Sequence, residues 1–112
     1  MPVVAVAEIF GISGRRSELL DVLTRAERHV RQLPGVRRYA FAARLDAPDE
    51  FVLISEWDSH DAMAAYHRSE RFAAYQLDLH GLLARPSEMT IYSVTDELRP
   101  VPSGPPDPRD AA

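Results

Sequence analysis

Apolar residues follow two different spacings along the chain, and each spacing predicts one kind of element. Short runs in which consecutive or alternate positions are apolar are typical of strands, whereas apolar residues three or four positions apart are typical of helices. Four strands are predicted, at 3–10, 36–45, 51–57 and 88–98. Helices are predicted between them at 15–33, at 60–66, and from Ser69 to a stop at Pro86.

Signals at the helix ends support this assignment. The first helix has an apolar stripe with steps of four, three, four and three residues: Leu19, Leu23, Ala26, Val30 and Leu33. Pro34 and Gly35 end it, because proline does not continue a helix and glycine accepts the conformation that closes one. Ser59 and Ser69 are predicted caps of the next two helices, since a serine hydroxyl accepts a hydrogen bond from a free backbone N–H. The last helix has its own stripe: Phe72, Tyr75, Leu79, Leu82 and Leu83.

The order of the elements reads β-α-β-β-α-β, with the two short helices in one α segment. This is the ferredoxin-like split arrangement, so we expect an α+β fold with a four-stranded antiparallel sheet. The helices can cover only one face of that sheet, yet Val4 and Val6 alternate with Val3 and Ala5, so both faces are apolar. Soluble monomers rarely expose a large apolar patch. The pattern therefore predicts a homodimer in which two sheets face each other.

Composition limits the class of protein. The chain has 112 residues, and we expect one domain over 1–98 followed by a disordered, proline-rich tail over 99–112. The net charge of -4 argues against nucleic acid or an anionic membrane as a partner. The absence of cysteine excludes disulfides, thiolate metal sites and cysteine nucleophiles. No apolar run is long enough to span a bilayer and no signal peptide is visible, so a cytoplasmic location is expected.

A set of short motifs also occurs in a fixed order: Ala7-Glu8-Ile9, Gly14, Leu19-Leu20, Pro34-Gly35-Val36, Phe51-Val52-Leu53, Glu56-Trp57-Asp58-Ser59, Ala62, Ser69-Glu70-Arg71-Phe72 and Tyr92. In this order and spacing the chain, up to Leu98, resembles the antibiotic biosynthesis monooxygenase family of the dimeric α+β barrel superfamily. The resemblance implies a homodimer and, in each subunit, a ligand pocket between sheet and helices. It leaves the reaction open, because this family includes quinone-forming oxygenases, heme-degrading enzymes and isomerases.

Some positions depart from particular branches of that family. Heme-degrading relatives use an asparagine on the first strand, a tryptophan on the short helix and a heme-ligating histidine on the next helix. The corresponding residues here are Ile9, Tyr66 and Gln76, so heme degradation is not expected. Leu53 stands where the anthrone-oxygenase branch tends to have asparagine, while Trp57 is retained.

The candidate catalytic residues are His67 as general base and Tyr66 and Trp57 as hydrogen-bond donors. Histidine titrates near neutral pH, and buried tyrosine and tryptophan need a partner for their polar atoms. The candidate substrate-binding residues are Phe41, Phe72 and Tyr75. Each has a purely structural alternative: His67 could be a boundary residue in contact with solvent, Trp57 a core wedge, and the aromatic set, which includes Tyr39, mostly core packing.

The other ionisable residues favour structural roles. Glu8 and Glu56 interrupt apolar strands, and we expect a salt bridge with a nearby arginine rather than a catalytic carboxylate. His60 and His67 are seven residues apart, but no third ligand is suitably spaced, so no metal is expected. His29 and His80 are expected at the surface.

The leading hypothesis is a cofactor-independent monooxygenase that oxidises a reduced polycyclic aromatic or phenolic compound, such as an anthrone or quinol, with O2. No phosphate loop, flavin fingerprint or nicotinamide fingerprint is present, so no cofactor is expected. Two alternatives remain: an isomerase or lyase of the same fold that acts on a small carbonyl metabolite, and a non-catalytic ligand-binding or stress-response module.

Overall fold

Four strands and three helices make up residues 1–94, the part of the chain that the computed structural model describes. The strands are β1 (Val3–Phe10), β2 (Val36–Ala43), β3 (Glu50–Trp57) and β4 (Glu88–Ser93). The helices are α1 (Arg16–Val30), α2 (His60–His67) and α3 (Glu70–His80). The predicted tail over 99–112 and the end of the predicted fourth strand and domain, over 95–98, lie outside the described residues.

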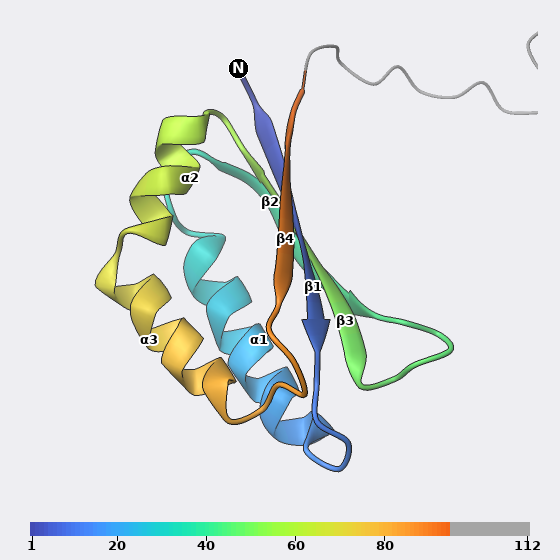
Figure 1. The fold of residues 1–112 in the computed structure, drawn as a ribbon. Helices are drawn as coiled ribbons and strands as arrows, with labels where there is room; N and C mark the ends of the chain where they lie inside the picture. Colours follow the sequence, from blue (N-terminus) through green and yellow to red (C-terminus); the bar gives the residue numbers. More distant parts are fainter. Residues whose placement is uncertain (95–112) are drawn as a thin grey trace, which may run out of the picture.

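The strands form one antiparallel sheet in the order β2-β3-β1-β4. A tight turn joins β2 to β3, in which the Glu50 N–H donates to the Ala47 carbonyl at 2.9 Å across Pro48. All three helices lie against the same face of the sheet (Figure 1). The predicted ferredoxin-like α+β fold with a four-stranded antiparallel sheet is therefore confirmed.

The first helix is shorter than the sequence pattern predicts. α1 ends at Val30 rather than at 33, and the Leu33 N–H donates to the Val30 carbonyl, three residues back, at 3.0 Å. Pro34 explains this tighter turn, because a proline ring disfavours the α conformation in the residue before it. β2 likewise ends at Ala43, two residues before the predicted end.

The last helix also ends early. α3 stops at His80, and Gly81 follows as its cap residue, since glycine is a poor helix former. Leu82 and Leu83 therefore do not extend the helical stripe, contrary to the prediction. The Leu82 carbonyl instead accepts a hydrogen bond from the Ile12 N–H at 2.9 Å, which ties the loop after α3 to the end of β1.

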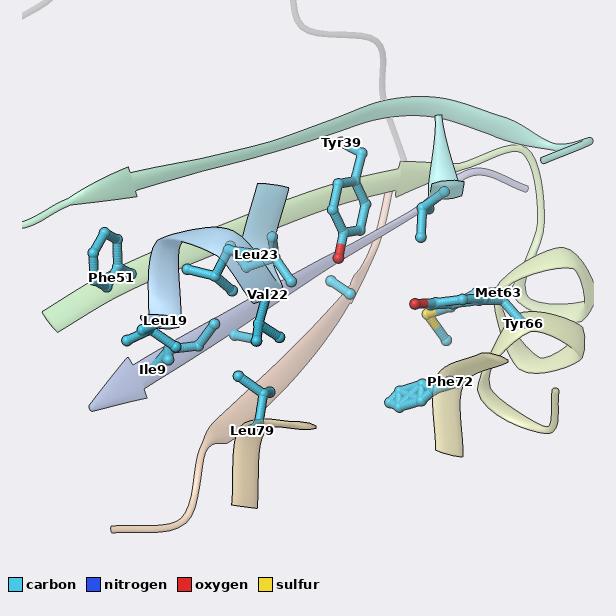
Figure 2. Packing of buried hydrophobic residues seen from close by; sticks show 14 of the residues in the cluster. Ile9, Leu19, Val22, Leu23, Tyr39, Phe51, Met63, Tyr66, Phe72 and Leu79 are labelled. Atoms are coloured by element: carbon cyan, nitrogen blue, oxygen red, sulfur yellow. The ribbon is translucent and has the colours of Figure 1, made fainter. Parts of the chain in front are cut away.

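The core lies between the sheet and the helices. On β1 the buried side chains alternate with less buried ones, and those facing the helices are Val3, Ala5, Ala7 and Ile9. Leu19 and Leu23 of the predicted α1 stripe are buried in the same cluster (Figure 2). Val30 of that stripe is also buried in it. Burial of each large apolar side chain stabilises the fold by about 1.5–3 kcal/mol.

Both predicted serine caps are confirmed. The Ser59 Oγ accepts a hydrogen bond from the Ala62 N–H at 3.1 Å, and the Ser69 Oγ accepts one from the Phe72 N–H at 3.2 Å. These caps fix the starts of α2 and α3, the two helices that carry most of the candidate site residues.

Gly35 holds the start of α2 against the sheet. Its φ angle of +85° lies in the left-handed region, and a Cβ at this position would approach the Ala62 Cβ to 2.7 Å. Its carbonyl accepts a hydrogen bond from the Asp58 N–H at 2.8 Å. A side chain at position 35 would therefore both strain the backbone and push α2 away from the end of β3.

The outer face of the sheet carries no helix within residues 1–94 (Figure 1). Ala40, Ile54, Val6 and Thr90 occupy one row across the four strands of this face. The neighbouring Val52 is also half-buried and lies on the same face. None of the helices in the described part is long and apolar enough to cross a membrane.

Candidate functional site

A cavity of about 680 Å³ lies between the inner face of the sheet and helices α2 and α3. Small side chains at Ala5 and Ala7 of β1 leave this space open. β4 is less well covered than its neighbours, so that Met89, which lines the cavity, is 45% exposed. A volume of this size is typical of small-molecule sites and accommodates a ligand of several fused rings.

Trp57, at the end of β3, forms one wall of this cavity and is almost fully buried. Its ring stacks on that of Tyr66, with centroids 5.7 Å apart and an angle of 22° between the planes. The Trp57 Nε1–H donates to the Ser55 Oγ at 3.0 Å. Trp57 thus packs in the core and lines the cavity at once, but its one donor is already used within the protein.

His67 is the last residue of α2 and lines the same cavity. Its ring lies edge-on to Phe72, with centroids 4.7 Å apart. Burial lowers the pKa of His67 below its usual value, and the nearby charge of His60 lowers it further. The imidazole is therefore neutral at neutral pH and can accept a proton.

Tyr66, Phe72 and Tyr75 complete the aromatic wall contributed by the helices. The Phe72 ring is edge-on to both tyrosines, at centroid distances of 5.2 Å from Tyr66 and 6.0 Å from Tyr75. Burial raises the pKa of Tyr66 to about 12 and also raises that of Tyr75. Both phenols consequently remain protonated near neutral pH and are hydrogen-bond donors.

The structure places Phe41 away from the cavity, in contrast to the other five predicted site residues. Its ring packs edge-on against Phe51 at 6.3 Å. Tyr39, two residues earlier on the same face of β2, lines the cavity instead and pairs with Ser55 in the sheet. Strand alternation indicates which face a side chain shares, but not how far along the strand the cavity lies.

Several polar residues that the sequence interpretation did not select also border the cavity. Gln76, His80 and Arg85 are exposed, so they mark its mouth between α3 and the loop before β4. His80 was expected at the surface, and it is exposed although it also borders the cavity. Only their positions could have indicated this, since Gln76 and His80 lie on α3 and Arg85 lies in the loop that returns the chain to β4.

The aspartate and glutamate side chains of the described residues lie outside the cavity. Glu56 forms a salt bridge with Arg37 at 3.8 Å, as expected, whereas Glu8 is exposed on the outer face of the sheet. Among the described residues, no aspartate or glutamate lines the cavity. Within residues 1–94 no group of three or more histidine, aspartate or glutamate side chains is arranged to hold a metal ion.

The fold and the cavity together define a class: ferredoxin-like α+β domains with a small-molecule pocket between sheet and helices. The family model for antibiotic biosynthesis monooxygenases matches residues 2–77. The chain therefore belongs to the antibiotic biosynthesis monooxygenase family. No curated protein sequence matches it closely enough to count as a relative.

Solved structures share this fold. Rv0793 from Mycobacterium tuberculosis is 26% identical, with a TM-score of 0.81, and the match covers 88% of this chain and 100% of that one. A protein from Deinococcus radiodurans is 18% identical, with a TM-score of 0.84, over 89% of this chain and 99% of that one. SnoaB from Streptomyces nogalater, a cofactor-independent oxygenase, is 24% identical, with a TM-score of 0.75, over 87% and 96%.

Proposed function

We propose that this protein is a cofactor-independent monooxygenase that oxidises a reduced polycyclic aromatic or phenolic compound with O2. The observation that carries the proposal is the neutral His67 at the wall of a largely apolar cavity. Membership of the antibiotic biosynthesis monooxygenase family supports it. The likeness to SnoaB, whose name describes a cofactor-independent oxygenase, supports the same chemistry.

Such a reaction needs no bound redox group when the substrate is its own reductant. A general base removes a proton from the activated carbon of an anthrone, which leaves an electron-rich enolate. The enolate passes one electron to O2, and the resulting radical pair joins to form a carbon–oxygen bond. The peroxide takes up a proton; loss of the second hydrogen on that carbon then breaks the O–O bond and releases water. One anthrone and one O2 thus give one anthraquinone and one water.

The residues fit the demands of the first step. His67 would act as the base, because its lowered pKa keeps it unprotonated at neutral pH. The protonated hydroxyl of Tyr66 would donate to the enolate oxygen. Phe72 and Tyr75 would hold the rings, and their apolar surface would keep water away from the anion. Trp57 would serve as a wall rather than as a donor, since its N–H is bonded to Ser55.

An oxygen electrode tests the proposal with anthrone as the substrate. We expect O2 uptake above the rate without protein, with one anthraquinone formed for each O2 consumed. Uptake no faster than that of the buffer, with both anthrone and hydroquinones, would contradict the proposal. Conversion without O2 would favour an isomerase or lyase, and thermal stabilisation by the ligand without any turnover would favour a binding module.

We also propose that two copies of the chain pair through the open face of the sheet. Val6 and Ile54 are neighbours in the sheet register at the middle of this face, and the helices lie on the other side. An uncovered apolar face is unfavourable in a soluble monomer. In a two-fold dimer the same face of a second copy would cover it.

Light scattering at low micromolar concentration tests the pairing. We expect twice the chain mass of 12.6 kDa. Ile54→Arg should give a monomer, because it places an unpaired charge in the interface, whereas Asp21→Arg on the exposed side of α1 should not. A wild-type protein that is stable and soluble at the mass of one chain would refute the dimer.

A further inference from the structure

Three tyrosines from three different elements reach the same cavity: Tyr39 from β2, Tyr66 from α2 and Tyr75 from α3. Tyr39 is 3% exposed and Tyr66 is 8% exposed, so their rings are buried. None of the three hydroxyls forms a hydrogen bond within residues 1–94. No side-chain oxygen in that part of the chain is both sealed off and unpartnered, so each hydroxyl oxygen keeps some accessible surface. Tyr39 lines this cavity, whereas Tyr66 and Tyr75 line it and also a second hollow beside α1.

The three hydroxyls also influence one another. Burial raises the pKa of Tyr39, and the charges that Tyr75 and Tyr66 would carry if ionised raise it further. Burial raises the pKa of Tyr75 in the same way, with Tyr66 as the second cause. Figure 2 shows the Tyr39 and Tyr66 oxygens pointing into the space between sheet and helices. The three groups are therefore protonated donors whose residues line the same cavity.

A cluster of unpartnered donors in an apolar cavity requires an acceptor. A hydroxyl in an apolar cavity is unfavourable until it finds a hydrogen-bond acceptor. No carboxylate lines the described cavity. The nearest like charge is that of Glu27 on α1, which is the smallest of the causes that raise the pKa of Tyr39 and would oppose an anion beside that hydroxyl. The guanidinium of Arg85 stands at the mouth of the cavity and favours an anionic ligand.

We infer that the hydroxyls of Tyr39, Tyr66 and Tyr75 together bind the charged oxygen of an aromatic enolate or phenolate. The inference takes its ligand class from the proposed function and deepens it. The oxygen that becomes negative when the substrate loses a proton lies among three preformed donors, which stabilise the anion more than the neutral compound. Tyr39 and Tyr75 would have the role of hydrogen-bond donor that the sequence analysis gave to Trp57. The Trp57 N–H already donates to Ser55.

A planar phenol that is already oxidised tests this binding without any turnover. The probe is 2-hydroxyanthraquinone, whose visible absorption changes when its hydroxyl ionises. Bound to the wild-type protein, it should ionise at least one pH unit lower than in buffer, which corresponds to tenfold or greater preference for the anion. Tyr39→Phe and Tyr75→Phe should each weaken binding of the anion roughly tenfold or more, with little change for the neutral form.

Two controls separate binding from a structural effect. Tyr92→Phe changes a tyrosine that is 55% exposed and outside the cavity, so it should leave the ionisation of the probe unchanged. Without the probe, Tyr39→Phe should keep or raise the thermal midpoint, because it removes a buried hydroxyl that has no partner. A hydroxyl whose role is structural would instead lower the midpoint when it is removed.

The result that would overturn the inference is a probe that does not bind, or that ionises at the same pH on the protein and in buffer. An equal effect of Tyr39→Phe and Tyr92→Phe would overturn it too. Failure of the proposed function looks different. In that case the bound probe would still ionise at lower pH, while anthrone would consume no O2 above the buffer rate.

Discussion

The rings of Trp57 and Tyr66 stack at 5.7 Å and join the end of β3 to the last turn of α2. This contact fixes the distance between the sheet and the helix that carries His67, and so sets the width of the cavity at that end. The Trp57 ring is held in turn by its hydrogen bond to Ser55. The stability of the fold and the shape of the site therefore depend on the same few side chains.

Truncation of this ring should destabilise the protein strongly. Trp57→Ala is expected to lower the free energy of unfolding by about 3–5 kcal/mol, because it leaves a large void in a closely packed region. Urea titration measures the change, and Leu77→Ala, at a position 76% exposed, serves as the control with an effect within about 0.5 kcal/mol. A loss of the same small size for Trp57→Ala would show that the ring is not a structural wedge.

The hydrogen bond to Ser55 can be tested separately. Ser55→Ala leaves the buried Trp57 N–H without its partner, and we expect a loss of about 1–3 kcal/mol in the free energy of unfolding. The matched control is Ser17→Ala on the exposed face of α1. If the two variants were equally stable, the Trp57 N–H would not depend on Ser55 for its hydrogen bond. It could then donate to a ligand in the cavity.

The two glycines next to the helices should respond in opposite ways to alanine. Gly35→Ala is expected to lower the free energy of unfolding by about 1–3 kcal/mol, because the residue has a φ of +85° and its new Cβ would meet Ala62 at 2.7 Å. Gly81→Ala should be neutral or stabilising by up to about 1 kcal/mol, since nothing lies within 4 Å of a Cβ there. Thermal unfolding of both variants measures the contrast, and a reversed order would contradict the role given to Gly35.

Much of the fold follows from local patterns in the sequence. The caps at Ser59 and Ser69 and the stripe that includes Leu19 and Leu23 are local signals, and the structure confirms them. The end of α1 at Val30 was missed, because it depends on how far Pro34 restricts the residues before it. Such a helix end depends on how a nearby proline restricts the backbone, and the spacing of apolar residues does not reveal this.

The site was less accessible from the sequence than the fold. Tyr39 and Phe41 have the same alternation phase and similar size, so the sequence offered no reason to prefer Tyr39 as a cavity residue. The choice depends on register, since Tyr39 lies opposite Ser55 and Phe41 lies opposite Leu53. The partner of the Trp57 N–H is likewise a tertiary detail: Ser55 is two residues away and on the same face of β3.

The pH dependence of activity gives the sharpest test of His67. Its pKa lies below the usual imidazole value of about 6.5, first through burial and second through the charge of His60. Activity that needs the neutral ring should therefore rise with pH below that value and be constant at neutral pH. His60→Ala removes the smaller cause, so the rise should move to somewhat higher pH with the maximal rate kept.

His67→Ala should lower turnover of anthrone by roughly 10²–10⁴-fold and abolish the rise of activity with pH.

The lowered pKa of His67 also affects the stability of the fold. Because the folded state binds a proton at His67 less readily than the unfolded state, the stability due to this group is present above about pH 6.5 and is lost as the pH falls below it. His67→Ala should accordingly lose less stability than the wild type between neutral and mildly acidic pH. Wild-type rates in this variant would remove His67 from the mechanism and leave Tyr66, or spontaneous ionisation of the substrate in the cavity, as the source of the anion.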